Sequence, residues 1–154
     1  MKYVLALDPS LSNTGIAIFD EKGTPIRNLS VGTNVKESHG KRLVNINDSL
    51  IGLNNEYNFC LLVCENCFTR FNKATQALYK VRGVIETIFA DIENIYYSPM
   101  TIKRAITGSG KSTKEELLQE VSKRYPEIKF ENYDACDAFC TGLTYFIEKR
   151  IIVK

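Results

Sequence analysis

Residues 3–20 read YVLALDPSLSNTGIAIFD, and this stretch decides the fold. Residues 3–7 form a continuous apolar run, which is typical of a strand buried on both faces. The run stops at Asp8 and is followed by the turn-forming residues PSLSNTG. Residues 15–20 are apolar again and predict a second strand. An acid therefore directly follows a buried strand, which is where ligands bind in α/β sheets.

The rest of the chain extends this beginning into an α/β domain. A third strand is expected at residues 26–33, after the turn EKGTP, which completes an antiparallel meander. Two further strands are expected at residues 59–64 and 95–97, joined by helical crossovers. Helices are expected at residues 38–52, 72–91, 99–106, 113–125 and 132–150. The order predicts one domain over residues 1–154, with a mixed five-stranded sheet flanked by helices.

Composition limits the classes of function. The 154 residues are 44% hydrophobic and 25% charged, as in an ordinary globular domain. The net charge of +2 is too small to indicate a nucleic-acid binder by itself, so any basic surface must be local. Five cysteines, an odd number, in a chain with no expected signal peptide or membrane span favour reduced thiols in the cytoplasm.

Four acids stand where a metal could use them. Asp8 and Glu65 each directly follow a buried strand, and burying a carboxylate there is costly unless a cation compensates it. Asp134 and Asp137 are three residues apart, so they share one face of the last helix. The alternative is structural: Asp8 can start a turn, and acids suit the first turn of a helix. Together the four predict a divalent-metal site for phosphodiester hydrolysis.

Four segments in order resemble the RuvC-type Holliday junction resolvases, a family with a ribonuclease H-like fold. They are LALDPSLSNTGIAIF, VCENCFTRFNKATQALYKVRGVIE, SPMTIKRAITGSGKSTKEEL and NYDACDAFCTGL. The resemblance covers nearly the whole chain, and its compact size is compatible with a phage version. It implies a homodimer in the cytoplasm of a bacterial or phage-infected host cell. This dimer would cut two opposed strands of a four-way DNA junction.

The resemblance also implies roles for particular residues. The Mg²⁺ ligands would be Asp8, Glu65, Asp134 and Asp137, with Mn²⁺ as an alternative metal. Two lysines, Lys103 and Lys114, match the family's functional lysines beside the scissile phosphate. Phe68 matches an aromatic that stacks on unpaired bases at the junction crossover. The family glycine after Asp-Pro is replaced by Ser10, and the segment CFTRFNK is its own variant, which leaves junction selectivity and cut-site preference open.

Two basic stretches add candidate DNA contacts. Arg70 and Lys73 follow Phe68, while Lys111 lies between the two matched lysines. Around an acidic site such residues would attract phosphate, and binding would weaken with salt. The alternative is that most of these residues are ordinary solvated surface residues without a role in DNA binding.

The stretch GSGKST at residues 108–113 suggests a nucleotide-binding P-loop, but it lacks two requirements. Ala105 stands where the motif needs its first glycine, and a helix rather than a strand is expected before it. We therefore expect no nucleotide cofactor. Zinc is also disfavoured, because the cysteines belong to apolar runs, and His39, the one histidine, is expected on the surface.

The hypothesis from sequence is a Mg²⁺-dependent, structure-selective DNA endonuclease acting on four-way or related branched junctions. Three alternatives remain open at this point. They are a nuclease of the same fold acting on RNA or RNA–DNA hybrids, a small ATP-binding protein, and a junction-binding module without catalysis.

Overall fold

The computed structural model describes residues 1–66 and 73–152 of the chain. Five strands form one mixed sheet in the order β3-β2-β1-β4-β5. They are β1 (Tyr3–Asp8), β2 (Asn13–Asp20), β3 (Pro25–Gly32), β4 (Phe59–Glu65) and β5 (Glu93–Tyr97). The first three strands pair antiparallel, whereas β1–β4 and β4–β5 pair parallel. The predicted meander with two added parallel strands is confirmed.

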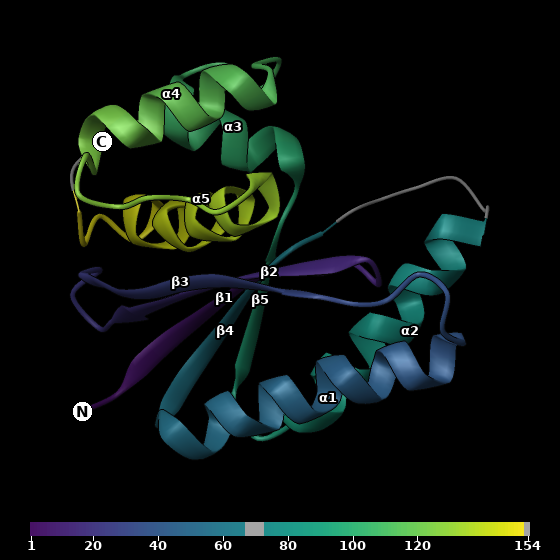
Figure 1. Ribbon diagram of the computed structural model, residues 1–154. Helices are drawn as coiled ribbons and strands as arrows, with labels where there is room; N and C mark the ends of the chain where they lie inside the picture. The colour runs from purple at the N-terminus through teal and green to yellow at the C-terminus, as the bar shows by residue number, and fades with distance from the viewer. Residues whose placement is uncertain (67–72, 153–154) are drawn as a thin grey trace.

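Helices cover both faces of this sheet (Figure 1). The helices are α1 (His39–Glu56), α2 (Lys73–Ile88), α3 (Pro99–Thr107), α4 (Lys114–Arg124) and α5 (Tyr133–Glu148). On one face α1 and α2 pack side by side, and on the other α5 lies against the strands with α3 and α4 beyond it. The result is a three-layer arrangement with an apolar core on each side of the sheet.

The alternation of side chains along β1 decides where its terminal acid points. Val4 and Ala6 belong to the core under α3, α4 and α5, while Leu5 and Leu7 belong to the core under α1 and α2. Because successive side chains in a strand point to opposite faces, Asp8 continues the row of Val4 and Ala6 on the α5 face. The same alternation in β4 places Glu65 on that face, after Leu61 and Val63.

The two acids also lie inside the strands and not in the turns that follow them. Asp8 pairs with Gly15 of β2, and Glu65 pairs with Tyr97 of β5. The predicted strands ended one residue earlier. The ladder therefore holds the backbone of both acids, which is firmer positioning than a turn would supply.

One helix extends beyond its predicted end. The expected range for α1 ended at Gly52, but the helix continues to Glu56. Leu53 is 6% exposed and continues the buried stripe of α1, so packing favours another turn. Gly52 does not adopt the left-handed conformation with which a glycine ends a helix.

The cysteines of the described segments are free thiols, as predicted. Cys64, Cys136 and Cys140 are buried in the two cores, and Cys60 is half-buried. Cys67 lies outside the described residues. Among the helices of residues 1–66 and 73–152, none combines the length and the apolar character needed to cross a lipid bilayer.

Gly142 allows α5 to approach the sheet closely. A Cβ at this position would overlap the ring of Phe19 and lie 3.0 Å from the Cβ of Ala6. We expect Gly142→Ala to lower the free energy of unfolding by ~1–3 kcal/mol, because overpacking a filled core forces its neighbours apart. The measurement is urea denaturation followed by circular dichroism.

The matched control is Gly52→Ala in α1, where an added Cβ meets no atom within 4 Å. That change should raise the free energy of unfolding by about 0.5–1 kcal/mol, since alanine favours the helix more than glycine does. Equal effects at the two glycines would contradict the close approach of α5.

Candidate active site

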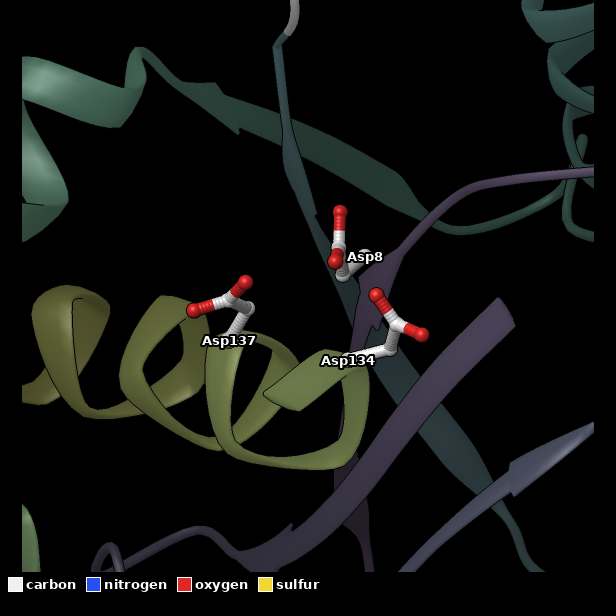
Figure 2. Close-up of side chains that lie close together, drawn as sticks. All are labelled: Asp8, Asp134 and Asp137. Carbon is white, nitrogen blue, oxygen red and sulfur yellow. The ribbon is translucent and has the colours of Figure 1, made fainter. Parts of the chain in front are cut away.

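Three carboxylates gather where β1 ends beside the first turns of α5 (Figure 2). Asp8 comes from β1, and Asp134 and Asp137 come from α5. One oxygen from each lies within 4.8 Å of the others, which is close enough to share a metal ion. Asp137 is buried, at 7% exposure, while Asp8 and Asp134 are half-buried. The structure thus brings together three of the four acids that the sequence selected.

The start of α5 is determined by its own sequence. Asn132 caps the helix, because its side-chain oxygen accepts a hydrogen bond from the backbone N–H of Ala135 at 2.9 Å. Asp134 then stands in the first turn, where the helix dipole favours an acid. Asp137 follows one turn later, so both acids face the end of β1.

The sheet holds this end of α5 in place through residues that sequence reasoning missed. Gly15 pairs with Asp8, and a Cβ on Gly15 would overlap the backbone carbonyl of Asp134. Asn13 donates a hydrogen bond from Nδ2 to Oδ2 of Asp134 at 2.7 Å. Asn28 of β3 donates to the carbonyl of Ala135 at 2.8 Å. Neither the turn PSLSNTG nor the third strand gave a signal for these contacts, because they join these segments to a helix more than a hundred residues later.

Glu65 lines the same cleft as Asp8 and Asp137 but lies outside the tight group of three acids. The cleft has a volume of about 330 Å³, and its polar lining includes Asp8, Glu65, Lys103, Lys114 and Asp137. The pairing of Leu7 with Cys64 places Asp8 and Glu65 at neighbouring positions on adjacent parallel strands. The negative charge of Glu65 acts on Asp8, since it raises the pKa of that carboxyl.

Lys114 is the cation in contact with the acids. Its Nζ donates to Oδ2 of Asp137 at 2.7 Å, in an ion pair whose lysine side chain is 54% exposed. Lys114 is the first residue of α4, directly after the cap Thr113, whose capping box with Glu116 confirms the predicted helix start. The second predicted lysine, Lys103 of α3, lines the same cleft.

Two further predicted DNA-binding residues, Lys111 and Lys73, lie outside the lining of the acidic cleft. Lys111 is exposed in the connection between α3 and α4, outside the lining of the acidic cleft. Lys73 is exposed on α2 and lines a separate hollow on the opposite side of the turn after β1. Phe68 and Arg70 lie outside the described residues.

The electrostatics of the cluster favour a bound cation. Burial raises the pKa of Asp8 well above its ordinary value of 3.8, and the charges of Glu65, Asp137 and Asp134 raise it further. Burial likewise raises the pKa of Asp137, although its hydrogen bond with Lys114 opposes this. Burial alone would lower the pKa of Lys114, but its bond to Asp137 raises it above 10.5. Lys114 therefore does not offset the burial and mutual repulsion that disfavour ionisation of these acids, and a bound divalent cation would.

The donor set indicates which metals fit. The three clustered groups and Glu65 all offer carboxylate oxygens, the ligands preferred by hard cations such as Mg²⁺ and Mn²⁺. Within residues 1–66 and 73–152, the group of acids that could hold a metal contains no cysteine or histidine.

The GSGKST stretch begins at the end of a helix, as predicted. Gly108 ends α3 in the left-handed conformation, with φ of 86°, and its N–H donates to the carbonyl of Arg104. The hydroxyls of Thr107 and Ser112 then bond to each other across the connection to α4. The strand that precedes a P-loop is replaced here by α3. The stretch instead connects two helices that carry Lys103 and Lys114.

A carboxylate cluster at the end of a mixed sheet, with lysines beside it, defines the class of metal-dependent nucleases with a ribonuclease H-like fold. The family model of the crossover junction endodeoxyribonuclease RuvC matches residues 4–145. The chain belongs to this family, which is divalent-metal dependent.

Individual relatives match along nearly their whole length. The chain is 30% identical to the crossover junction endodeoxyribonuclease RuvC of Prochlorococcus marinus (strain MIT 9211), over 97% of this chain and 98% of that protein. It is 34% identical to the RuvC of Ehrlichia canis (strain Jake), over 96% and 97%. The structure of T. thermophilus RuvC in complex with Holliday junction substrate superposes with a TM-score of 0.84 at 21% identity, covering 97% of this chain and 95% of that one.

We expect Asp8→Asn to stabilise the metal-free protein. The pKa of Asp8 is raised in the folded state, so ionisation at neutral pH destabilises the fold, and an uncharged amide removes this penalty. Relieving a strained functional site should add about 1–2 kcal/mol, so the Tm in EDTA at pH 7.5 should rise by roughly 2–8 °C. Thermal denaturation between pH 4 and 8 measures it.

The sign of the pH dependence provides a further check. The penalty is absent below the ordinary value of 3.8 and fully present above the raised folded pKa, so the gain should shrink as the pH falls. Asp91→Asn, at an exposed turn position, is the matched control and should leave Tm unchanged. A Tm equal to or below that of the wild type for Asp8→Asn would refute the electrostatic argument.

Proposed function

We propose that this chain, as a single nuclease domain over residues 1–154, resolves four-way DNA junctions by Mg²⁺-dependent hydrolysis of phosphodiester bonds. The observation that carries the proposal is the group formed by Asp8, Asp134 and Asp137, with oxygens within 4.8 Å, in a chain that matches the RuvC model over residues 4–145. The solved relative with a TM-score of 0.84 is described in complex with Holliday junction substrate, which supports the choice of DNA.

The four acids would hold the metal. Asp8, Asp134 and Asp137 supply one oxygen each from the tight group, and Glu65 supplies another from the adjacent strand. When bound, the metal would activate a water for attack on phosphorus and stabilise the leaving oxygen. The same positions suit Mn²⁺, and a comparison of the two metals belongs to the assay.

The chain's own contribution is to orient the acids and the DNA. Asn13 donates a hydrogen bond to Oδ2 of Asp134 and would hold this carboxylate in one orientation for the metal. Lys114 neutralises part of the charge on Asp137, so a phosphate can approach acids that would otherwise repel it. Lys103 lines the wall of the cleft, which supports the proposal that it contacts a non-bridging oxygen of the scissile phosphate.

Symmetric resolution of a junction requires two copies of this site. Among the described residues the chain has one acidic group of this kind, and a four-way junction is cut on two opposed strands. We therefore propose a homodimer, whose two-fold axis suits a nearly two-fold substrate. Phe68, Arg70, Lys73 and Lys111 are proposed to contact the DNA outside the reacting phosphate.

The experiment compares cleavage of a labelled four-way junction, a flap, a linear duplex and an RNA–DNA hybrid in Mg²⁺. The wild type should cut the junction at least about tenfold faster than the duplex or the hybrid, and Asp8→Asn should cut none of them. Loss of one metal ligand typically lowers the cleavage rate by orders of magnitude, while DNA binding is retained. Mobility shift in the same buffer measures that binding.

Two outcomes would change the proposal. Preferred cleavage of the hybrid would reassign the substrate to RNA within the same fold. Undiminished cleavage by Asp8→Asn would remove the acids from the mechanism altogether.

The two cleft lysines should affect cleavage more than binding. We expect Lys103→Ala and Lys114→Ala to lower the single-turnover rate by about 10²–10³-fold, as for the removal of one electrostatic stabiliser, while junction Kd changes less than about threefold. Lys111→Ala, outside the cleft, serves as the comparison and should reduce binding and cleavage in parallel. If all three variants lose binding and rate equally, then Lys103 and Lys114 only dock the DNA.

A further inference from the structure

A second hollow lies on the other side of the turn that follows β1. Its volume is about 420 Å³, and it is formed between this turn, the beginning of α1 and the exposed face of α2. The lining residues are Leu11, Ser12, His39, Arg42, Lys73, Gln76, Ala77 and Lys80. Three of these carry positive charge, one is a histidine, and none is an acid. The hollow therefore has the chemistry of an anion site, opposite in character to the acidic cleft.

Arg42 is the buried part of this hollow. The residue is 7% exposed, yet the three groups that accept hydrogen bonds from its side chain are all neutral. Its Nε donates to Oγ1 of Thr33 at 2.8 Å, and its Nη2 donates to the carbonyl of Leu11 at 3.2 Å and to Oγ of Ser12 at 3.3 Å. A buried guanidinium usually has a carboxylate beside it, because its charge is costly to remove from water. Among the described residues Arg42 has none, so its charge is available to an anion in the hollow.

The lysines of α2 surround the same space. Lys73, Gln76 and Lys80 follow one another at spacings of three and four, so they project from one face of the helix. Within the described parts of the chain, neither lysine forms an ion pair. His39, in the first turn of α1, adds an imidazole N–H from the neighbouring helix, which packs side by side with α2 (Figure 1). Donors from two helices thus converge on a single hollow.

One short turn separates the basic hollow from the acidic cleft. Pro9 and Ser10 line the cleft, while Leu11 and Ser12 line the hollow. About four residues of chain lead from Asp8 to Ser12 and span at most about 14 Å. A DNA strand advances about 3.4 Å along the helix axis per nucleotide, so the two hollows are at most about four nucleotides apart along a strand.

We propose that the basic hollow formed by His39, Arg42, Lys73 and Lys80 binds a backbone phosphate of the strand being cut, within about four nucleotides of the scissile phosphate. The inference rests on the proposed function, since it assumes a DNA strand in the acidic cleft. Gripping the strand on both sides of residues 9–12 fixes its position and direction over the acids. The contact is to phosphate and carries no sequence information, so it positions the strand and does not select the base.

The test uses Lys73→Gln/Lys80→Gln, both made in an Asp8→Asn background so that the junction stays intact. The matched control is Lys129→Gln/Lys149→Gln, which removes the same charge from two exposed lysines away from both hollows. Fluorescence anisotropy measures Kd for a synthetic four-way junction between 50 and 200 mM KCl. The first pair should weaken binding about 5–20-fold at 100 mM and reduce the salt slope by about one, while the control pair changes Kd less than about twofold.

A second measurement locates the phosphate. Single methylphosphonate linkages, which lack the charge, are placed at each of the first six positions on either side of the cut in the same junction. One or two of these linkages within the proposed window should weaken junction binding by the protein that retains Lys73 and Lys80. The same linkages should not weaken binding by the Lys73→Gln/Lys80→Gln protein. This non-additivity identifies a direct contact, which a general loss of positive charge would not produce.

The outcomes separate the inference from the proposed function. Equal Kd and salt slope for the two lysine pairs, or linkages that cost both proteins equally, would overturn the basic hollow while junction cleavage by the wild type stands. A wild type that neither binds nor cuts the junction would overturn both. Circular dichroism and Tm must show that all variants are folded, and Lys73 and Lys80 are exposed on α2, so unfolding is not expected.

Discussion

The structure depends on holding three carboxylates together against their mutual repulsion. Asp8, Asp134 and Asp137 present oxygens within 4.8 Å of one another, partly removed from water, and burial raises the pKa of Asp8 and of Asp137. Such a group is unfavourable by itself, so the remainder of the fold must supply the free energy that keeps it in place. Lys114 offsets part of the charge through its 2.7 Å ion pair with Asp137. The remaining negative charge makes the site receptive to a divalent cation.

The two cores of the sheet supply that free energy, and α5 transmits it to the site. Gly142 brings α5 onto Phe19 and Ala6 in the middle of the sheet, while Gly15 makes room for its first turn beside Asp8. Packing of α5 thus fixes the distance between acids that lie more than a hundred residues apart. This division, in which an apolar interface stabilises an electrostatically strained group, is a common source of the conflict between stability and activity.

The turn at residues 9–12 joins two surfaces of opposite charge. Its first half lines the acidic cleft and its second half lines the basic hollow, where Arg42 holds it through the carbonyl of Leu11 and the hydroxyl of Ser12. The net charge of the chain is only +2, so these local groups of basic residues matter more to a polyanion than the overall charge does. The connection that resembled a P-loop has a simpler part in this arrangement. It joins α3 to α4, each of which carries one lysine of the cleft.

The sequence by itself determined the layers and the chemistry of the site. Apolar runs marked the strands, the helical stripes marked the helices, and Asp8 and Glu65 stood out because charge directly after a buried strand is costly. Only the tertiary structure decided how the acids meet: Glu65 stands beside a tighter group of three, Asn13 and Gly15 seat Asp134, and Lys73 faces a hollow away from the acids. Local sequence carries propensity and periodicity, which act over a few residues. The contacts that arrange the site join β1 and β2 to α5, so they arise from strand register and helix packing, which no local pattern records.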